Sequence, residues 1–331
     1  MKILVTGGAG FIGSHLCEKL LELEHEVTCL DNFNKFYDPN IKRDNIRKCK
    51  SNGAFTLIEG DLLDLPRVRN LLSAEKFDVV VHLAAIPGVR PSVKDPFPYE
   101  ENNIRGTLNM LQTCKESGAN KFIFASSSSV YGIGLTAPFK ETLAVGRPAS
   151  PYAATKLAGE VMCHAFHHVH GINMAILRYF TVYGPRQRPE MAIHKFTRKA
   201  LDGEVIKKFG DGSSVRDYTY IDDVIDVTVK SIEKCEGYEI YNVGNSAGIT
   251  LNDLLKLIGD TVGVELNVEQ VEEVAGDVPL TLADVTRAKL KLGYKPSVAI
   301  DDGIGRFVQW LKSKREADEQ RESSSKEEPE T

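Results

Sequence analysis

The sequence predicts an α/β protein in which a doubly wound parallel sheet carries a smaller α/β domain. In the first half, short and nearly continuous apolar segments alternate with longer segments of helical spacing. Strands that are apolar on both faces are typical of parallel sheets covered by helices on both sides. After about residue 180 the alternation loosens, and 331 residues are more than one small core requires.

The strands of the first half are expected in six apolar segments: residues 2–7, 26–31, 54–61, 77–85, 121–127 and 172–180. The first helix, "FIGSHLCEKLLE" at 11–22, places Ile12, Leu16 and Leu20 on one face. A later helix begins in "SPYAATK", where Ser150 is suited to the N-cap and Pro151 to the first helical position.

The second half predicts a loop at 184–191, a helix at 192–201, a short strand and turn within 205–217, a helix at 220–234 and a strand at 239–244. Residues 250–315 show three helical patterns and one strand. We therefore expect one domain from residues 1–180 with about 219–247, and a second from about 181–218 with 248–315. Residues 316–331 hold seven acidic and two basic residues and few apolar ones, which predicts a disordered acidic tail.

Composition excludes several classes of protein. The net charge of −5 equals that of the tail, so the folded part is close to neutral and offers no basic surface for nucleic acid. No apolar run approaches the roughly 20 residues that span a membrane. The N-terminus "MKILVTG" reads as a strand rather than a signal peptide. Six scattered cysteines indicate reduced thiols in a cytoplasmic protein.

A glycine-rich turn follows the first strand. "VTGGAGFIG" places Gly7 for a tight turn, Gly10 for close approach of a pyrophosphate, and Gly13 for packing of helix on strand. The helix N-terminus then faces the phosphates. Asp31, at the end of the second strand, would bind ribose hydroxyls and repel a 2′-phosphate, so we expect NAD rather than NADP. Asp61, after the third strand, would meet the adenine edge.

Tyr152 and Lys156 lie four residues apart, on one face of the predicted helix. A nearby ammonium, together with a positive nicotinamide ring, would favour the phenolate. Lowering the pKa of the phenol by about 3 units would take roughly 4 kcal/mol. Tyr152 is therefore a candidate general base.

The segments "TGGAGFIG", "HLAA", "NNIRGTLNML", "SSSSVYG" and "YAATK" resemble the extended short-chain dehydrogenase/reductases. The resemblance implies a Rossmann fold, catalysis by Tyr152, Lys156 and Ser127, and a nucleotide-sugar substrate. Ser126 would only satisfy backbone groups at the strand end. Helices near 97–117 and 152–170 match those that pair in family homodimers. The implied NAD-binding residues are Gly7, Gly10, Phe11, Ile12, Gly13, Asp31, Asn32, Asp61, Leu62, Leu83, Ala84, Ala85, Asn103, Tyr152 and Lys156.

Within that family, "RYFTVYGPRQRP", "HLAAIPGVRPS" and "FGDGSSVRDYTYIDD" are similar to the UDP-glucuronate 4-epimerases, which form UDP-galacturonate. The similarity implies that Ser128, Ser129, Thr181 and Arg188 hold the uronate carboxylate. Contacts to the uracil and diphosphate are implied for Lys195, Phe196, Lys207, Phe209 and Arg216. Arg216 is expected where "VRDYTY" opens a helix. Asp277 would meet the ribose, although the arginine that often precedes this Gly-Asp pair is missing.

Other reactions stay open. A 4,6-dehydratase would carry an Asp-Glu pair where this chain has Ser128 and Ser129. The remaining alternatives are a UDP-glucose/UDP-galactose 4-epimerase, a UDP-glucuronate decarboxylase, and an NAD-bound regulatory protein, which would usually lack the Tyr or Lys. The histidines at 164, 167, 168 and 170 indicate a solvated or dimer-facing helix end rather than a metal site.

Overall fold

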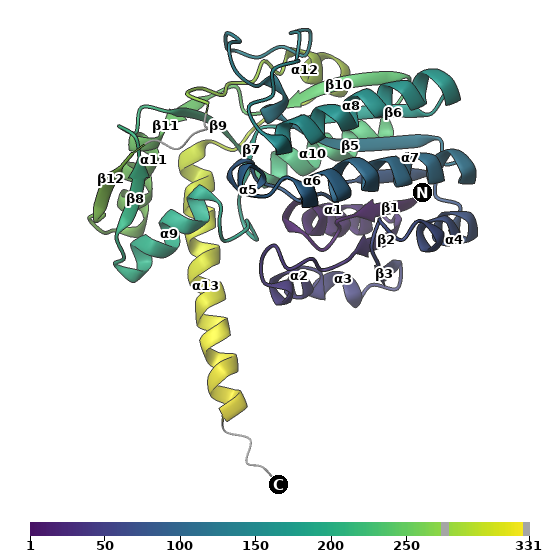
Figure 1. Ribbon diagram of the computed structural model, residues 1–331. Helices are drawn as coiled ribbons and strands as arrows, with labels where there is room; N and C mark the ends of the chain where they lie inside the picture. The colour runs from purple at the N-terminus through teal and green to yellow at the C-terminus, as the bar shows by residue number, and fades with distance from the viewer. Residues whose placement is uncertain (273–277, 327–331) are drawn as a thin grey trace.

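The computed structural model describes residues 1–272 and 278–326. Its larger part is a sheet of seven parallel strands in the order β10-β6-β5-β4-β1-β2-β3, which confirms the doubly wound α/β fold class (Figure 1). The strands are β1 (Lys2–Thr6), β2 (Glu26–Asp31), β3 (Phe55–Glu59), β4 (Val79–His82), β5 (Lys121–Ser127), β6 (Asn173–Tyr179) and β10 (Tyr238–Val243).

Helices cover both faces of this sheet. On one face lie α1 (Phe11–Glu22) and α10 (Ile221–Glu233), and on the other α4 (Leu65–Glu75), α7 (Gly106–Ser117) and α8 (Pro151–His170). Successive residues of β1 serve both cores, since Ile3 packs in the first and Leu4 in the second. This two-sided burial explains why the strands read as continuous apolar runs.

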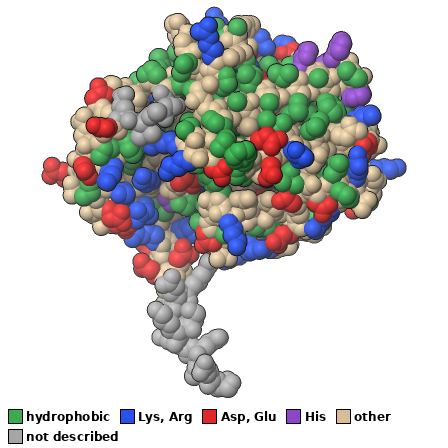
Figure 2. Space-filling view, in the orientation of Figure 1, with side chains coloured by type: hydrophobic (Ala, Val, Ile, Leu, Met, Phe, Trp, Pro, Cys, Tyr) green, Lys and Arg blue, Asp and Glu red, His purple; other side chains and the backbone are tan. Residues whose placement is uncertain are grey.

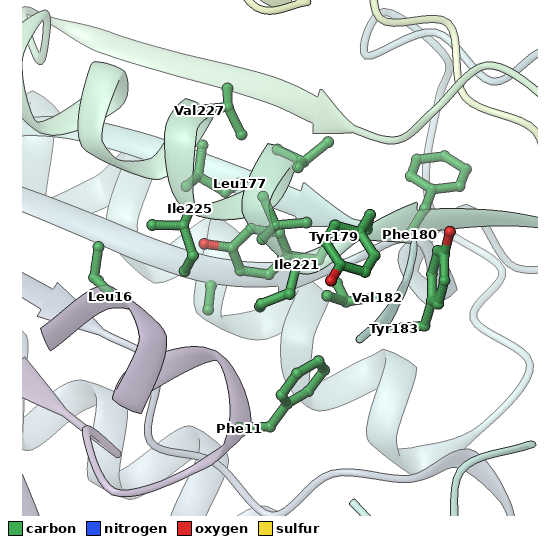
Figure 3. Close-up of a cluster of buried hydrophobic side chains, with 14 of the residues drawn as sticks. Phe11, Leu16, Leu177, Tyr179, Phe180, Val182, Tyr183, Ile221, Ile225 and Val227 are labelled. Carbon is green, nitrogen blue, oxygen red and sulfur yellow. The ribbon is translucent and has the colours of Figure 1, made fainter. Parts of the chain in front are cut away.

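The core beneath the first face joins the two parts of the molecule. Figure 3 shows side chains of α1, β6 and α10 meeting in one cluster, with Leu16, Leu177, Ile221 and Ile225 among them. Phe180, Val182 and Tyr183 extend the same cluster along the chain beyond β6. The segment that leaves the large sheet is therefore anchored by the core that covers one face of that sheet.

The second part is built around two small sheets. One has the order β11-β9-β7, from β7 (Thr181–Tyr183), β9 (Val215–Tyr220) and β11 (Gly248–Thr250), and the other pairs β8 (Ile206–Phe209) with β12 (Val268–Val271). Its helices are α9 (Ala192–Asp202), α11 (Leu251–Val262) and α13 (Ile300–Lys326), whereas α12 (Thr286–Leu292) packs against α10 and β10 of the large sheet. The chain returns to the large sheet for α10 and β10, which pairs with β6.

The remaining elements are short. They are α2 (Pro39–Asn45), α3 (Arg47–Lys50), α5 (Val89–Lys94), α6 (Phe97–Tyr99), the π-helix η1 (Glu100–Arg105) and the 3₁₀-helix η2 (Ser128–Tyr131). None of the described helices combines the length and apolar character needed to cross a bilayer.

Two expectations about local structure are wrong. "VRDYTY" is strand β9 rather than the start of a helix, because its Val, Tyr and Thr residues favour an extended strand, which pairs with β7 and β11. Helix α10 begins only at Ile221. Residues 316–326, expected to be disordered, continue helix α13 to Lys326. Glu, Gln, Lys and Arg favour helix even without apolar residues, and Lys314 pairs with Asp318 at 3.2 Å.

Candidate active site

A cavity of about 680 Å³ lies between the large sheet and the second part of the molecule. Residues at or just beyond the carboxyl ends of β1 to β6 line one side of it, as is usual for ligand sites in doubly wound folds. In Figure 2 basic side chains gather around the hollow between the two parts. The expected NAD-binding residues on its wall are Gly7, Gly10, Phe11, Ile12, Gly13, Asp31, Asn32, Asp61, Leu62, Leu83, Ala84, Ala85, Tyr152 and Lys156.

The glycine turn can bind a dinucleotide because the missing side chains leave space for close approach of the backbone. Gly7 has φ +69°, and a Cβ there would lie 2.8 Å from the backbone nitrogen of Ala84. A Cβ on Gly13 would lie 2.3 Å from the carbonyl oxygen of Gly7. Helix α1 begins at Phe11, and no side chain caps it. Its first N–H groups are thus free to bind a pyrophosphate, which side chains at these glycines would exclude.

Asp31 occupies the position expected of a ribose ligand. It ends β2, is 6% exposed, and accepts hydrogen bonds from the backbone of Ala9 (3.2 Å) and Phe33 (2.8 Å). The ammonium of Lys42 lies 3.8 Å from its carboxylate. Asn32 donates to Asp61 (2.8 Å), so these two cavity residues also fix one another. Lys42 also lines the cavity, and sequence reasoning missed it because no motif surrounds it.

Asn103 differs from the expectation. It lies in η1, is 2% exposed, and is not on the cavity wall. Its side-chain oxygen accepts a hydrogen bond from the backbone N–H of Ile86 (2.8 Å). Its side-chain nitrogen donates to the backbone carbonyl of Ile86 (3.0 Å) and to the hydroxyl of Thr155 (3.1 Å). Asn103 therefore holds the segment after β4 against α8.

Ser127, Tyr152 and Lys156 come together on the cavity wall from β5 and α8. The Ser150 hydroxyl caps α8 by accepting from the backbone of Ala153 (3.2 Å), and Pro151 occupies the first turn, as expected. The ammonium of Lys156 donates to the carbonyl of Ala125 (2.7 Å), two residues before Ser127.

Burial dominates the pKa values of this group. Burial raises the pKa of the Tyr152 phenol, while the hydrogen bond with Ser127 and the charge of Arg188 act to lower it. Burial also lowers the pKa of Lys156 to about 8, against the charge of Glu160. The protein groups alone therefore leave the phenol above its ordinary pKa, and a lowered pKa needs a further positive charge in the cavity.

The four serines have different partners. Ser126 was expected to satisfy backbone, but its hydroxyl donates to the Glu160 carboxylate (2.5 Å). The Ser127 hydroxyl donates to that of Ser129 (3.1 Å) and accepts from the backbone of Ser129 (3.1 Å), which caps η2. Ser128 also lines the cavity.

The opposite wall comes from the second part of the chain. The expected substrate-binding residues found there are Thr181, Arg188, Lys195, Phe196, Lys207, Phe209 and Arg216. Arg188 pairs with Glu190, its Nε lying 2.8 Å from the carboxylate. Arg216 extends from β9 and donates to the carbonyl of Val215 (2.9 Å). Asp277 lies outside the described residues.

Two charged residues of the wall were missed. No sequence motif indicated a role for Glu190, and only its closeness to Arg188 in the sequence could have suggested one. Arg90 lies in "GVRPS", part of a segment that is similar to the epimerases, but that similarity implied no role for Arg90. Its guanidinium lies 4.5 Å from the centre of the Phe209 ring, so α5 and β8 meet across the cavity.

The histidines near the end of α8 pack against other groups. The rings of His164 and His167 lie 5.0 and 5.9 Å from that of Tyr238. Across the described ranges, no group of three or more His, Cys, Asp or Glu side chains is arranged to hold a metal ion.

Comparison with known proteins gives consistent results. Residues 3–244 match the family model described as "NAD dependent epimerase/dehydratase family". A UDP-glucuronate 4-epimerase of Thermodesulfobacterium geofontis is 38% identical, over 93% of this chain and 95% of that protein. The crystal structure of a Bacillus cereus UDP-glucuronic acid 4-epimerase with UDP-glucuronic acid and NAD is 41% identical, with TM-score 0.90, over 95% and 99%. A Thermotoga maritima UDP-glucose 4-epimerase with UDP-glucose is 34% identical, with TM-score 0.88, over 95% and 100%.

Proposed function

The chain belongs to the NAD-dependent epimerase/dehydratase family, and we propose that it interconverts UDP-glucuronate and UDP-galacturonate by epimerisation at C4 through a 4-keto intermediate. The observation that carries the proposal is that one cavity contains both sets of groups. It joins the glycine turn and Asp31 to Ser127, Tyr152 and Lys156 on one side, and to Arg188 on the other.

NAD, the cofactor of this family, would supply the hydride acceptor at C4 when bound. The 4-keto sugar would have to turn over before the hydride is returned, so that it arrives on the opposite face of C4. Tyr152 takes the proton of the C4 hydroxyl, and Ser127 donates a hydrogen bond to the same oxygen. The ammonium of Lys156, held by the Ala125 carbonyl, stabilises the phenolate. Because burial otherwise raises the pKa of Tyr152, the base forms only with positive charge beside it.

The carboxylate of the sugar is held by Arg188 with the hydroxyls of Ser128, Ser129 and Thr181. A guanidinium and several hydroxyls are the donors that a carboxylate prefers. The 4-keto intermediate is a β-keto acid, which loses carbon dioxide fastest when its C5–carboxylate bond is perpendicular to the carbonyl plane. The hydroxyl cluster keeps that bond away from perpendicular and so separates this enzyme from the decarboxylases.

A UDP-glucose 4-epimerase is the second candidate, and one observation favours it. Glu190 already pairs with Arg188, so the guanidinium has a carboxylate partner within the chain. A neutral sugar would leave that pair undisturbed. The choice between the two substrates depends on whether the uronate competes successfully for Arg188.

The assembly and compartment are part of the same proposal. The face formed by α6, α7 and α8 carries exposed apolar side chains, including Phe97 (76% exposed), Leu108 (43%), Val161 (62%) and Val169 (68%) (Figure 2). Such a face favours a homodimer in which these helices pair. All six cysteines are free and buried, and the thiol of Cys17 donates to the backbone carbonyl of Gly8 (3.9 Å), which favours a reducing, cytoplasmic compartment.

Incubation of the purified protein with UDP-glucuronate, without added cofactor, tests the reaction. We expect UDP-galacturonate to form, with no net reduction of NAD, and chromatography of the products separates the two uronates from UDP-pentose. A parallel reaction with UDP-glucose ranks the second candidate. Formation of UDP-galactose alone would replace the proposal with that candidate, and UDP-pentose as the main product would make the enzyme a decarboxylase.

A further inference from the structure

A buried ion pair lies directly behind the catalytic groups. The carboxylate of Glu160 accepts from Arg178 twice, from Nε at 2.9 Å and from an Nη at 2.7 Å. Their side chains are 4% and 2% exposed. The ring of Tyr131 lies 4.8 Å from the guanidinium. Neither charge has water to stabilise it, so each depends on the other.

The pair connects three elements that carry the catalytic residues. In the register of the sheet, Ser126 of β5 lies opposite Arg178 of β6, one residue before Ser127. Ser126 donates to Glu160, and Lys156 donates to the carbonyl of Ala125. Two successive turns of α8 therefore hold the two residues of β5 that precede the catalytic serine.

Glu160 is also the carboxylate whose charge acts on Lys156. The residues are four apart on α8, and the charge of Glu160 raises the pKa of Lys156 against burial. Burial raises the pKa of the Cys163 thiol on the same helix, so that group stays neutral. From β4, His82 also faces the ammonium, but burial, together with the charge of Lys156, lowers the pKa of His82 to about 3, so it is neutral. From β5 the ammonium meets the Ala125 carbonyl and the ring of Phe124. Arg178 on β6 pairs with Glu160.

We propose that Glu160 is a positioning residue of the reaction: through Ser126 it fixes the end of β5 at Ser127, and through its charge it keeps Lys156 protonated at working pH. The inference rests on the proposed function, since it assigns the ammonium of Lys156 a part in epimerisation. If Glu160 served folding alone, its replacement would lower the stability of the protein but would leave the pKa of Lys156 unchanged.

The test compares pH profiles of Glu160→Gln with wild type. The amide keeps the shape and an acceptor for Ser126 but removes the charge. Without that charge the pKa of Lys156 falls, so the ammonium is lost at lower pH. In the pH profile of kcat, we expect the alkaline limb to shift to lower pH by at least about half a unit, since an opposite charge nearby typically shifts a pKa by roughly 1–3 units.

A second variant guards against misfolding, because Glu160→Gln leaves Arg178 buried without its partner. Glu160→Gln/Arg178→Gln removes both charges and lets the two amides bond. We expect a smaller shift in the same direction, since Glu160 lies one turn from Lys156 on α8, whereas Arg178 extends from β6. Asp223→Asn is the matched control. It also neutralises a buried carboxylate, which accepts from Ser297 (3.0 Å) and Val298 (3.1 Å), far from Lys156 in the sequence, and it should lower Tm without moving the limb.

In the double variant, kcat could instead fall by the same factor at every pH, with the alkaline limb of its pH profile unchanged. That result would overturn the inference. Titration of Lys156 by NMR, with 13C-labelled lysine and Lys156→Met for assignment, reads its pKa without any substrate. This separates the two proposals. Absence of epimerisation in wild type would refute the proposed function, while an unchanged Lys156 titration in the double variant would refute the role of Glu160.

Discussion

The two walls of the cavity are built in different ways. The wall beside β1 and β2 consists largely of backbone and small residues, with Gly7, Gly10 and Gly13 within a few positions of one another. The opposite wall consists of long charged or aromatic side chains from separate elements, among them Arg188 and Arg216. Backbone groups suit the part of a ligand that a whole family shares, and long side chains suit the part that differs between substrates.

The largest effect is expected where the two walls meet. Tyr152→Phe should lower kcat about 10³-fold, because loss of a general base typically costs 10²- to 10⁴-fold. Steady-state turnover of UDP-glucuronate measures it. Tyr99→Phe is the matched control, since its ring lies 6.2 Å from that of Tyr152 and its hydroxyl donates only to the carbonyl of Pro87. Equal losses in both variants would contradict a catalytic role for Tyr152.

The next effect sharpens the difference between the walls. Arg188→Met should raise KM for UDP-glucuronate by about 10- to 100-fold, because a charge-assisted hydrogen bond is worth roughly 1.5–3 kcal/mol. KM for UDP-glucose should change little. If both KM values rise by the same factor, Arg188 binds a part that the two substrates share, and the assignment to the carboxylate is wrong.

A third change acts on the wall beside β1 and β2. Gly7→Ala should weaken NAD binding about tenfold or more, and lower stability by about 1–2 kcal/mol, because its φ is +69° and the added Cβ meets Ala84. NAD retained after purification and the thermal unfolding midpoint measure the two effects. Gly53→Ala, with nothing within 4 Å of its Cβ, should change neither. Both uronate and neutral substrates should be affected alike, in contrast to Arg188→Met.

The smallest effect concerns fidelity rather than rate. Thr181→Ala should increase the UDP-pentose and NADH released per turnover by a few-fold, while kcat stays within about tenfold, because only one of several donors to the carboxylate is lost. Product analysis by chromatography and absorbance at the NADH band measure it. Unchanged by-product release would remove Thr181 from the group that protects the carboxylate.

The same contrast explains what the sequence could predict. The parallel strands, the glycine turn, and the pairing of Tyr152 with Lys156 depend on local spacing, and the structure places them as expected. The Glu160 carboxylate, which accepts a hydrogen bond from Ser126, is 34 residues away in the sequence. The guanidinium of Arg178, which pairs with that carboxylate, comes from another strand. Burial of Tyr152, which raises its pKa, likewise depends on how the elements pack. Such features come from contacts between distant segments, which spacing does not record.

The return of the chain to the large sheet affects how the protein can be made. Strand β10 pairs with β6 only after the β7–β9 segment has been synthesised, and α10, which packs with α1, arrives at the same late stage. Until then a nascent chain exposes an unpaired strand edge together with the apolar side of its first helix, two features that promote aggregation. A fragment ending after β6 would keep both defects permanently. The large sheet with its helices is thus contiguous in space but not in sequence, and we expect an N-terminal piece ending after β6 to aggregate.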